Sequence, residues 1–338
     1  PRLPRLPGVR VVACADLLPE RAQEAAARHG VPSAATVDKL LADPDVDIVL
    51  NLTIPAAHAE VSLAAVAAGK HVYSEKPLAV SAEDGRKLLA AAREAGVRVG
   101  AAPDTFLGAA VQTGQRLIRD GAIGEPVAAA GFMLCPGHES WHPAPDFHYQ
   151  PGGGPLFDMG PYYLTALICL LGPVARVSCS ARASFPERTA ADGHTIDVEV
   201  DTHVAGLLEF ASGAICHLVT SFDVQAEAMP HGIAVYGSTG TLTLADPNGF
   251  VGPVTIGRGD DSGWQRQPEA SPYDGFDRGS GVAEMADAVR AGRPHRASGE
   301  LAQHVLDTMA TMLEAARTGR RLDVPSTCAP PEPLPSNP

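Results

Sequence analysis

The first hundred residues alternate short, β-branched apolar segments with stretches of helical composition. The helical stretches close on Gly30, Gly69 and Gly96, and glycine is the usual residue just beyond a helix C-terminus. The segment at residues 47–52 is nearly all apolar, as strands are in a parallel sheet covered on both faces. Strands separated by helices of this length form βαβ units, so we expect a Rossmann-type, doubly wound parallel sheet of the α/β class. The expected strands are residues 9–15, 47–52, 71–74 and 97–100, and the expected helices are 19–29, 57–68 and 81–95.

The pattern changes after residue 103, where short strand-like segments are joined by glycine-rich turns. Residues 197–209 and 214–222, separated by Ser212-Gly213, have the pattern of a β-hairpin. This half of the chain predicts an α+β domain with a large, mainly antiparallel sheet. The expected strands are 126–134, 174–184, 197–210, 213–224, 231–237, 240–245 and 250–256, and the expected helices are 161–171, 282–291 and 300–318.

Asp16 is the most informative residue of the opening stretch, because it ends the first expected strand. An acidic residue there binds the adenosine ribose in dinucleotide-binding folds, about 20 residues after a G-x-G-x-x-G loop. The residues that precede Asp16 in this sequence contain no such loop, because the sequence begins too close to Asp16. We therefore expect the sequence to lack the first strand, the phosphate loop and most of the first helix, with residues 2–6 as the end of that helix. The alternative is that Asp16 is a turn residue of another α/β fold.

These patterns predict three parts. Residues 1–103 form the expected dinucleotide-binding domain, and residues 104–324 form the α+β domain. The tail at 325–338 is rich in proline and serine, and we expect it to be disordered.

The composition limits the classes of partner. A net charge of −13 argues against nucleic acid or an anionic membrane as a main partner, because both require clustered Lys and Arg. The longest apolar run, residues 164–171, is far shorter than the roughly 20 residues that span a bilayer, so it predicts a buried helix. The six cysteines are scattered without a C-x-x-C pair, which favours a reducing, cytoplasmic location.

Five short motifs occur in a characteristic order along the chain. Together they resemble the Gfo/Idh/MocA family, named after glucose–fructose oxidoreductase and inositol dehydrogenase, and the resemblance covers essentially the whole chain. The motifs are Asp16, Thr53-Ile54-Pro55-x-x-His58, Ala68-Gly69-Lys70-His71-Val72, Glu75-Lys76-Pro77 and Gly152-Gly153-Gly154-x-x-x-Asp158-x-Gly160-x-Tyr162.

The resemblance implies hydride transfer between a nicotinamide cofactor and a secondary hydroxyl of a sugar or cyclitol. It also implies that Lys76 hydrogen-bonds the reacting hydroxyl and that Asp158 orients the substrate and Lys76. Many relatives carry their general base, a histidine, at the position that is Tyr162 here. A tyrosine has an ordinary pKa near 10, so it would need a nearby cation such as Lys76 to act as a base. The alternative is that Tyr162 is only a packing aromatic.

The resemblance further implies residues that bind the cofactor and the substrate. Asp16 disfavours a 2′-phosphate by its charge, so NAD is expected rather than NADP. For His58, a local helix-capping role is the alternative to cofactor contact. A polar and aromatic cluster, with Glu139 and Phe147 among its members, suits the faces and hydroxyl rim of a sugar ring. The expected cofactor-binding residues are Asp16, Thr53, Pro55, His58, Glu75, Lys76 and Pro77, and the expected substrate-binding residues are Asp104, Trp141, His142 and Tyr149.

Residues 138–142 match H-E-x-x-H, the pattern of zinc peptidases. That motif works on a helix, where both histidines share one face. Here Pro136-Gly137 precede it and Pro143 follows, so a stable helix is excluded, and we expect neither a zinc peptidase nor a metal site.

Two other functions remain open at this point. Some members of the family are redox-neutral glycosidases that use tightly held NAD, and the chain could also be a non-catalytic binding protein without a cofactor loop. By resemblance, we expect a homodimer or homotetramer that associates through the sheet of the second domain.

Overall fold

The computed structural model describes the chain except for residues 1–5, 7, 227–230, 261–262, 270–276 and 336–338. It divides into two compact units. The first comprises Pro1–Asp104 and Asp277–Ala302, and the second comprises Thr105–Phe276 and Gln303–Pro338. The expectation of one continuous second domain at 104–324 is therefore wrong, because residues 277–302 belong to the first unit.

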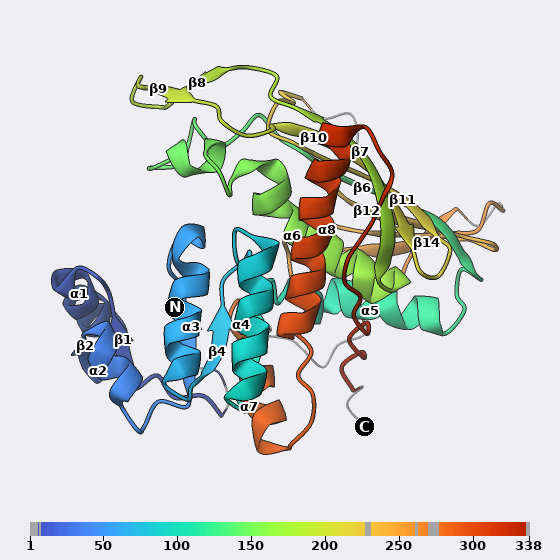
Figure 1. Ribbon diagram of the computed structural model, residues 1–338. Coiled ribbons are helices and arrows are strands. Elements are labelled where there is room, and N and C mark those ends of the chain that lie inside the picture. Colours follow the sequence, from blue (N-terminus) through green and yellow to red (C-terminus); the bar gives the residue numbers. More distant parts are fainter. Residues whose placement is uncertain (1–5, 7, 227–230, 261–262, 270–276, 336–338) are drawn as a thin grey trace. The chain divides into compact units, whose positions relative to one another are not determined.

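Parallel strands form two separate small sheets in the first unit (Figure 1). Strand β1 (Ala13–Ala15) pairs with β2 (Ser33–Ala35), and β4 (His71–Ser74) lies between β3 (Ile48–Asn51) and β5 (Val99–Ala101). The expected α/β class is confirmed. Strand β2 was not predicted, because Ser33-Ala34-Ala35 has little β propensity.

The three helices predicted between residues 19 and 95 form within one residue of their expected ends, whereas the helix at Val37–Ala42 was not predicted. Ser81 Oγ accepts a hydrogen bond of 3.1 Å from the N–H of Asp84, and Gly30 ends the first helix with a φ of 67°. Helices α3 and α4 pack beside each other near β4 (Figure 1). The helices are α1 (Pro19–His29), α2 (Val37–Ala42), α3 (His58–Ala67) and α4 (Ala82–Glu94).

Residues 277–302 join the first unit through backbone hydrogen bonds. The N–H groups of Gly279 and Gly281, at the start of α7 (Ser280–Arg290), each donate to Asp104 Oδ2 at 2.9 Å. The N–H of Ala101 donates to the carbonyl of Ala297 at 3.1 Å, next to β5. A Cβ atom on Gly281 would lie 2.0 Å from Tyr73 Oη, so only glycine fits there. These contacts explain why a segment distant in sequence completes the first unit.

A nine-stranded sheet dominates the second unit (Figure 1). Its order is β15-β14-β13-β12-β6-β11-β10-β7-β16, and only β6 and β11 are parallel neighbours, which confirms the predicted large, mainly antiparallel sheet. The hairpin of β10 and β11 forms as predicted, with Gly213 at a φ of 93° in its turn. The strands are β6 (Pro126–Leu134), β7 (Val174–Arg182), β10 (His203–Phe210), β11 (Ile215–Ser221), β12 (Gly232–Gly237), β13 (Thr241–Leu244), β14 (Val254–Gly257), β15 (Trp264–Arg266) and β16 (Leu322–Asp323), and β8 (Glu187–Thr189) pairs separately with β9 (Thr195–Asp197).

Helices α5 (Ala109–Arg119) and α6 (Gly154–Leu171) lie in this unit, and α8 (Gly299–Thr318) belongs to it from Gln303 onward. Helix α6 begins seven residues before the predicted start at 161, because Pro161 is accommodated inside the helix. It is the one helix in the described part of the chain that is long and apolar enough to cross a membrane, but 89% of it is buried, as in a core helix. Met312 of α8 lies over Gly206 of β10, where a Cβ atom would be 2.6 Å from the Met312 Cε.

The expectation of a disordered tail is wrong for residues 325–335, of which residues 331–334 lie against α5. Gln115 Nε2 donates to the carbonyl of Pro331 at 2.6 Å, and the N–H of Leu334 donates to Gln112 Oε1 at 2.7 Å. The side chain of Leu334 is buried. A proline-rich segment forms few backbone hydrogen bonds of its own, so the polar side chains of α5 supply its partners.

Candidate active site

The Glu75-Lys76-Pro77 motif follows directly after β4. The N–H of Glu75 donates to the carbonyl of Asn51 at the end of β3, and the N–H of Lys76 donates to Glu75 Oε2 at 3.1 Å. Lys76 therefore lies at the carboxyl edge of the β3–β4–β5 sheet. Open α/β sheets bind their ligands at this edge.

His58 connects this motif to the turn after β3. Its Nδ1 lies 2.6 Å from the carbonyl oxygen of Pro77, and its Nε2 lies 2.9 Å from the carbonyl oxygen of Thr53. A neutral imidazole can donate to only one of the two. Both ring nitrogens thus face backbone oxygens, and the side chain is buried. This geometry gives His58 a structural role that links two loops, which differs from the helix-capping alternative, since no side chain caps the start of α3.

A buried hydrogen-bond network that the sequence did not reveal centres on Asn51. Its Nδ2 donates to the carbonyl of His58 and to Ser62 Oγ, both at 3.0 Å, and its Oδ1 accepts from Thr53 Oγ1 at 2.7 Å. The expected cofactor residue Thr53 is held in place by this network. An asparagine at the end of an apolar strand was the only signal of it in the sequence.

A cavity of about 390 Å³ opens at the same edge of the sheet. Leu50, Leu52, Ser74 and Glu75 contribute to its lining. Among the described residues, Ser74 Oγ is buried and has no hydrogen-bond partner. Apolar side chains with a few polar groups suit a nicotinamide and its ribose, so these residues fit the expected cofactor.

Asp16 lies where the sequence placed it, directly after β1. Its side chain is exposed, and Oδ1 accepts a hydrogen bond from the N–H of Leu18 at 2.9 Å. It therefore forms a turn and presents a carboxylate to solvent at the same time. A ribose hydroxyl could use the second carboxylate oxygen.

Asp104, expected to bind substrate, belongs to the first unit and caps α7 through Gly279 and Gly281. Burial raises the pKa of its carboxyl group, and the two N–H donors oppose this shift. Trp141, by contrast, belongs to the second unit. The structure thus gives Asp104 a capping role and does not place it in one unit with the other expected substrate residues.

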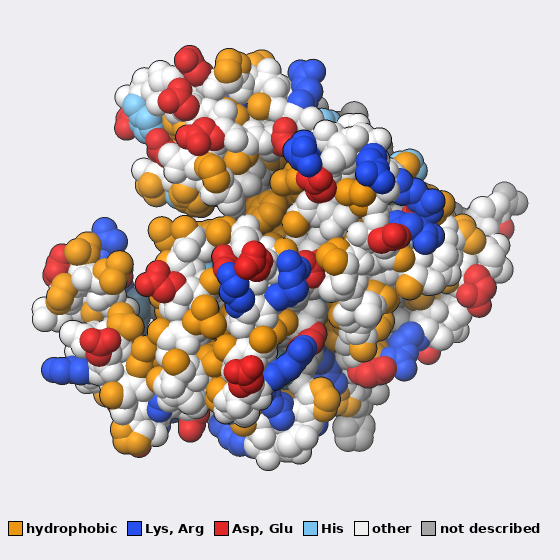
Figure 2. All heavy atoms as spheres, viewed as in Figure 1, with side chains coloured by type: hydrophobic (Ala, Val, Ile, Leu, Met, Phe, Trp, Pro, Cys, Tyr) orange, Lys and Arg blue, Asp and Glu red, His pale blue; other side chains and the backbone are white. Residues whose placement is uncertain are grey.

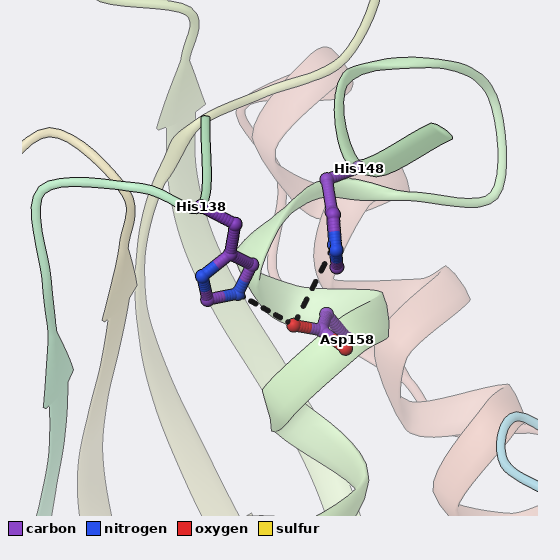
Figure 3. Close-up of side chains that lie close together, drawn as sticks. All are labelled: His138, His148 and Asp158. Carbon is purple, nitrogen blue, oxygen red and sulfur yellow. Dashed lines mark hydrogen bonds and ion pairs between the residues drawn. The ribbon is translucent and has the colours of Figure 1, made fainter. Parts of the chain in front are cut away.

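Asp158 and Tyr162 lie one turn apart on α6, and side chains with this spacing share a helix face. Figure 3 shows that His138 and His148 both face the Asp158 carboxylate. His138 Nε2 is 3.0 Å from Asp158 Oδ2, and His148 Nδ1 is 3.8 Å from the same oxygen. The side chain of Tyr162 is buried.

Tyr149 and Glu139 form a separate buried network. The Tyr149 hydroxyl donates to Glu139 Oε2, and Arg188 Nη1 donates to Glu139 Oε1 at 3.0 Å. Arg188 also pairs with Asp223. Burial, together with the bond to Glu139, raises the pKa of Tyr149. Tyr149 and Glu139, both expected near a substrate, are therefore hydrogen-bonded to other protein groups. Arg188 was not among the site residues predicted from the sequence.

The aromatic part of the expected substrate cluster is open to solvent. Trp141 is 65% exposed and Phe147 is 45% exposed. The ring of His142 lies between them, with centroid distances of 5.5 Å to Trp141 and 5.4 Å to Phe147. These three residues present a continuous aromatic surface.

Comparisons with known proteins identify the family. The family described as "Oxidoreductase family, NAD-binding Rossmann fold" matches residues 3–102, and that described as "GFO/IDH/MocA C-terminal domain" matches residues 111–243. The chain belongs to the Gfo/Idh/MocA oxidoreductases. As a member of this family it is a nicotinamide-dependent dehydrogenase or reductase acting on CH–OH groups, and its cofactor is NAD.

Several Gfo/Idh/MocA relatives have assigned activities. The chain is 30% identical to 1,5-anhydro-D-fructose reductase of Ensifer adhaerens, over 95% of this chain and 92% of that protein. It is 28% identical to levoglucosan dehydrogenase of Pseudarthrobacter phenanthrenivorans, over 71% and 66%. The structure of an NAD-binding oxidoreductase from Klebsiella pneumoniae aligns with a TM-score of 0.83 at 26% identity, covering 95% of this chain and 92% of that one.

Proposed function

We propose that this oxidoreductase interconverts a secondary hydroxyl and a ketone on a pyranose-like ring. The observation that carries the proposal is the position of Lys76, two residues beyond the end of β4 at the ligand-binding edge of its sheet. The names of the two relatives, a reductase of an anhydro-ketose and a dehydrogenase of an anhydro-sugar, support a compact sugar ring as substrate.

Lys76 would stabilise negative charge on the reacting oxygen. NAD, when bound, supplies the hydride acceptor for oxidation and, when reduced, the donor for the reverse reaction. Loss of a proton from the hydroxyl leaves an alkoxide, and a positioned ammonium group stabilises that charge. Leu50, Leu52 and Ser74 would hold the nicotinamide half of the cofactor, and Asp16 would bind the adenosine ribose.

Asp158 and Tyr162 would handle the proton and orient the substrate. The Tyr162 phenolate accepts the hydroxyl proton in the oxidation direction and returns it in reduction. His138 donates a hydrogen bond to Asp158, which fixes the direction of the carboxylate. The exposed faces of Trp141 and Phe147 would stack on the apolar face of the sugar ring, with His142 at its rim.

The outer face of the nine-stranded sheet supports a homodimer or homotetramer. Ala128 of β6 pairs with both Ile215 of β11 and Tyr236 of β12, so these residues form a row across three strands. Ile215, Tyr236 and Leu207 are large hydrophobic residues with more than 40% of their surface exposed. Light scattering should give a multiple of 35.0 kDa, and Ile215→Lys combined with Tyr236→Lys should give monomers.

We assign the protein to the cytoplasm, which the six free cysteines support.

The deciding experiment for function follows NADH absorbance while the purified protein is offered 1,5-anhydro-D-fructose with NADH, or levoglucosan with NAD. Turnover of at least one substrate in proportion to NADH change supports the proposal. Cleavage of aryl glycosides without net NADH formation would instead identify a redox-neutral glycosidase.

A further inference from the structure

Three ligand atoms from separate segments of the second unit converge on one point. His138 lies in the turn after β6, His148 lies in a short 3-10 helix (Asp146–Tyr149), and Asp158 lies on α6. Their ligand atoms all lie within 4.8 Å of one another. Figure 3 shows both imidazoles directed at the same carboxylate oxygen.

Two separations describe how the imidazoles face the Asp158 carboxylate. The 3.0 Å separation of His138 Nε2 from Asp158 Oδ2 is a hydrogen bond, but the 3.8 Å separation of His148 Nδ1 from that oxygen is too long for one. Two ligands of a tetrahedral zinc ion, each about 2.0–2.1 Å from the metal, lie about 3.3 Å apart. The observed separations fall on either side of that value, so small movements would bring both nitrogens and the oxygen onto one ion.

Packing fixes the imidazoles and leaves the cluster accessible. The ring of His138 packs against His148, Phe222 and Trp141, with centroids 4.5, 4.6 and 5.1 Å away. The side chains of His138, His148 and Asp158 are 13%, 8% and 17% exposed. A largely desolvated carboxylate attracts a cation strongly, and the remaining exposure leaves room for water as a further ligand.

We propose that His138 Nε2, His148 Nδ1 and an Asp158 carboxylate oxygen bind a divalent transition-metal ion of the zinc type. A set of two imidazoles and one carboxylate binds Zn²⁺ in preference to Mg²⁺, because imidazole nitrogen is a common ligand of zinc and magnesium favours oxygen ligands. This site differs from the H-E-x-x-H motif, because Glu139 is paired with Arg188 and His148 takes the place of His142. Coordination replaces the hydrogen bond to Asp158, so His138 binds the ion through an unprotonated Nε2 and the single proton of the neutral imidazole moves to Nδ1.

The proposal goes beyond the dehydrogenase function and shares Asp158 with it. An ion on this carboxylate removes it from orienting the substrate. Zinc is therefore expected to inhibit turnover, and substrate is expected to relieve that inhibition.

The test measures metal binding without any substrate. The full chain is stripped with a chelator, dialysed against Zn²⁺ or Co²⁺ and analysed for bound metal, with Co²⁺ absorbance reporting nitrogen and oxygen ligands. One ion per chain is expected, with no comparable binding of Mg²⁺. His138→Ala, His148→Ala and Asp158→Asn should each weaken binding at least tenfold, since loss of a single ligand costs at least as much as loss of an outer-shell partner.

His142→Ala is the matched control, because this histidine comes from the same loop and lies outside the three ligands. Its binding should equal that of the unchanged protein, and thermal unfolding of every variant verifies folding. Equal metal content in the unchanged protein and the folded His138→Ala/His148→Ala variant would overturn the proposal and place the metal outside this cluster. NADH binding, measured on the same samples, separates failure of the metal site from failure of the dehydrogenase function.

Discussion

His58 Nδ1 lies 2.6 Å from the carbonyl oxygen of Pro77, the residue that follows Lys76. Through its other nitrogen, the same imidazole reaches Thr53. The loop that carries the proposed catalytic lysine is therefore fastened to the neighbouring loop by one buried side chain. This relationship makes His58 a positioning residue for Lys76.

Replacing His58 with Ala should loosen both loops. We expect a loss of about 1–3 kcal/mol in the free energy of unfolding, because buried carbonyl groups lose a partner. The dissociation constant for NADH should rise as well. Denaturant titration and fluorescence titration with NADH measure the two effects, and His29→Ala, in α1 of the same unit, serves as the control. Unchanged values in both measurements would contradict the positioning role.

Lys76→Ala should abolish most of the activity and leave the fold intact. Loss of a single charge-stabilising donor costs about 10²–10³-fold in kcat. Lys70→Ala is the control, since its ammonium donates to the carbonyl of Asp43 at 2.7 Å and is tied to a structural contact. Steady-state kinetics with NADH absorbance provide the measurement. Near-normal turnover in the Lys76 variant would show that the mechanism is wrong.

Tyr162→Phe tests the proton carrier without changing the shape of α6. We expect kcat to fall by about 10²-fold or more, the usual contribution of a general acid or base, with KM little changed. Tyr163→Phe is a close control, because the Tyr163 hydroxyl donates to the carbonyl of Phe132 at 2.9 Å. That variant should lose stability and keep its turnover. If the two variants behave alike, Tyr162 is a packing residue.

His304 should make the second unit sensitive to acid. The N–H of Val174 donates to His304 Nε2 at 3.0 Å, so that nitrogen must be unprotonated, and burial lowers the pKa of this imidazole. The unfolded chain then binds a proton that the folded chain does not. The contribution of the neutral His304 to the free energy of unfolding is therefore complete above about pH 6.5 and is lost as the pH falls below that value. His304→Gln should reduce the slope of unfolding free energy against pH between about 7 and 5. His217→Gln, on the exposed face of β11, should retain the slope of the unchanged protein.

Leu334→Ala tests whether the C-terminal segment stabilises the second unit. The side chain is 6% exposed, and its backbone N–H bonds to Gln112. We expect a loss of about 2 kcal/mol, at the lower end of the range for buried leucines because a terminal segment can relax. Thermal unfolding measures it, and Glu332→Ala, at an exposed ion pair with Arg119, should change little.

The sequence predicted the elements whose signals are local. Gly30 and Ser81 marked helix ends correctly, and the position of Lys76 after β4 followed from one apolar strand and one triplet. The start of α6 was missed because Pro161 resembles a first helical residue, although the helix continues through it from Gly154.

Features that depend on distant residues could not be predicted. The pairing of His138 with Asp158 joins a loop to a helix 20 residues later, and neither segment alone indicates it. The capping of α7 by Asp104 spans more than 170 residues. Only hydrogen-bond geometry in the folded chain identifies such partners, because residue type and spacing are compatible with many alternatives.

The return of residues 277–302 to the first unit has a consequence for biosynthesis. The ribosome completes residues 1–104 early, but the segment that provides the N–H partners of Asp104 emerges only after 172 intervening residues, from Thr105 to Phe276, have been made. Domains generally fold as units during synthesis, starting from the N-terminus. In this chain the first unit therefore stays incomplete, with Asp104 lacking these two N–H partners, until residues 277–302 have been synthesised.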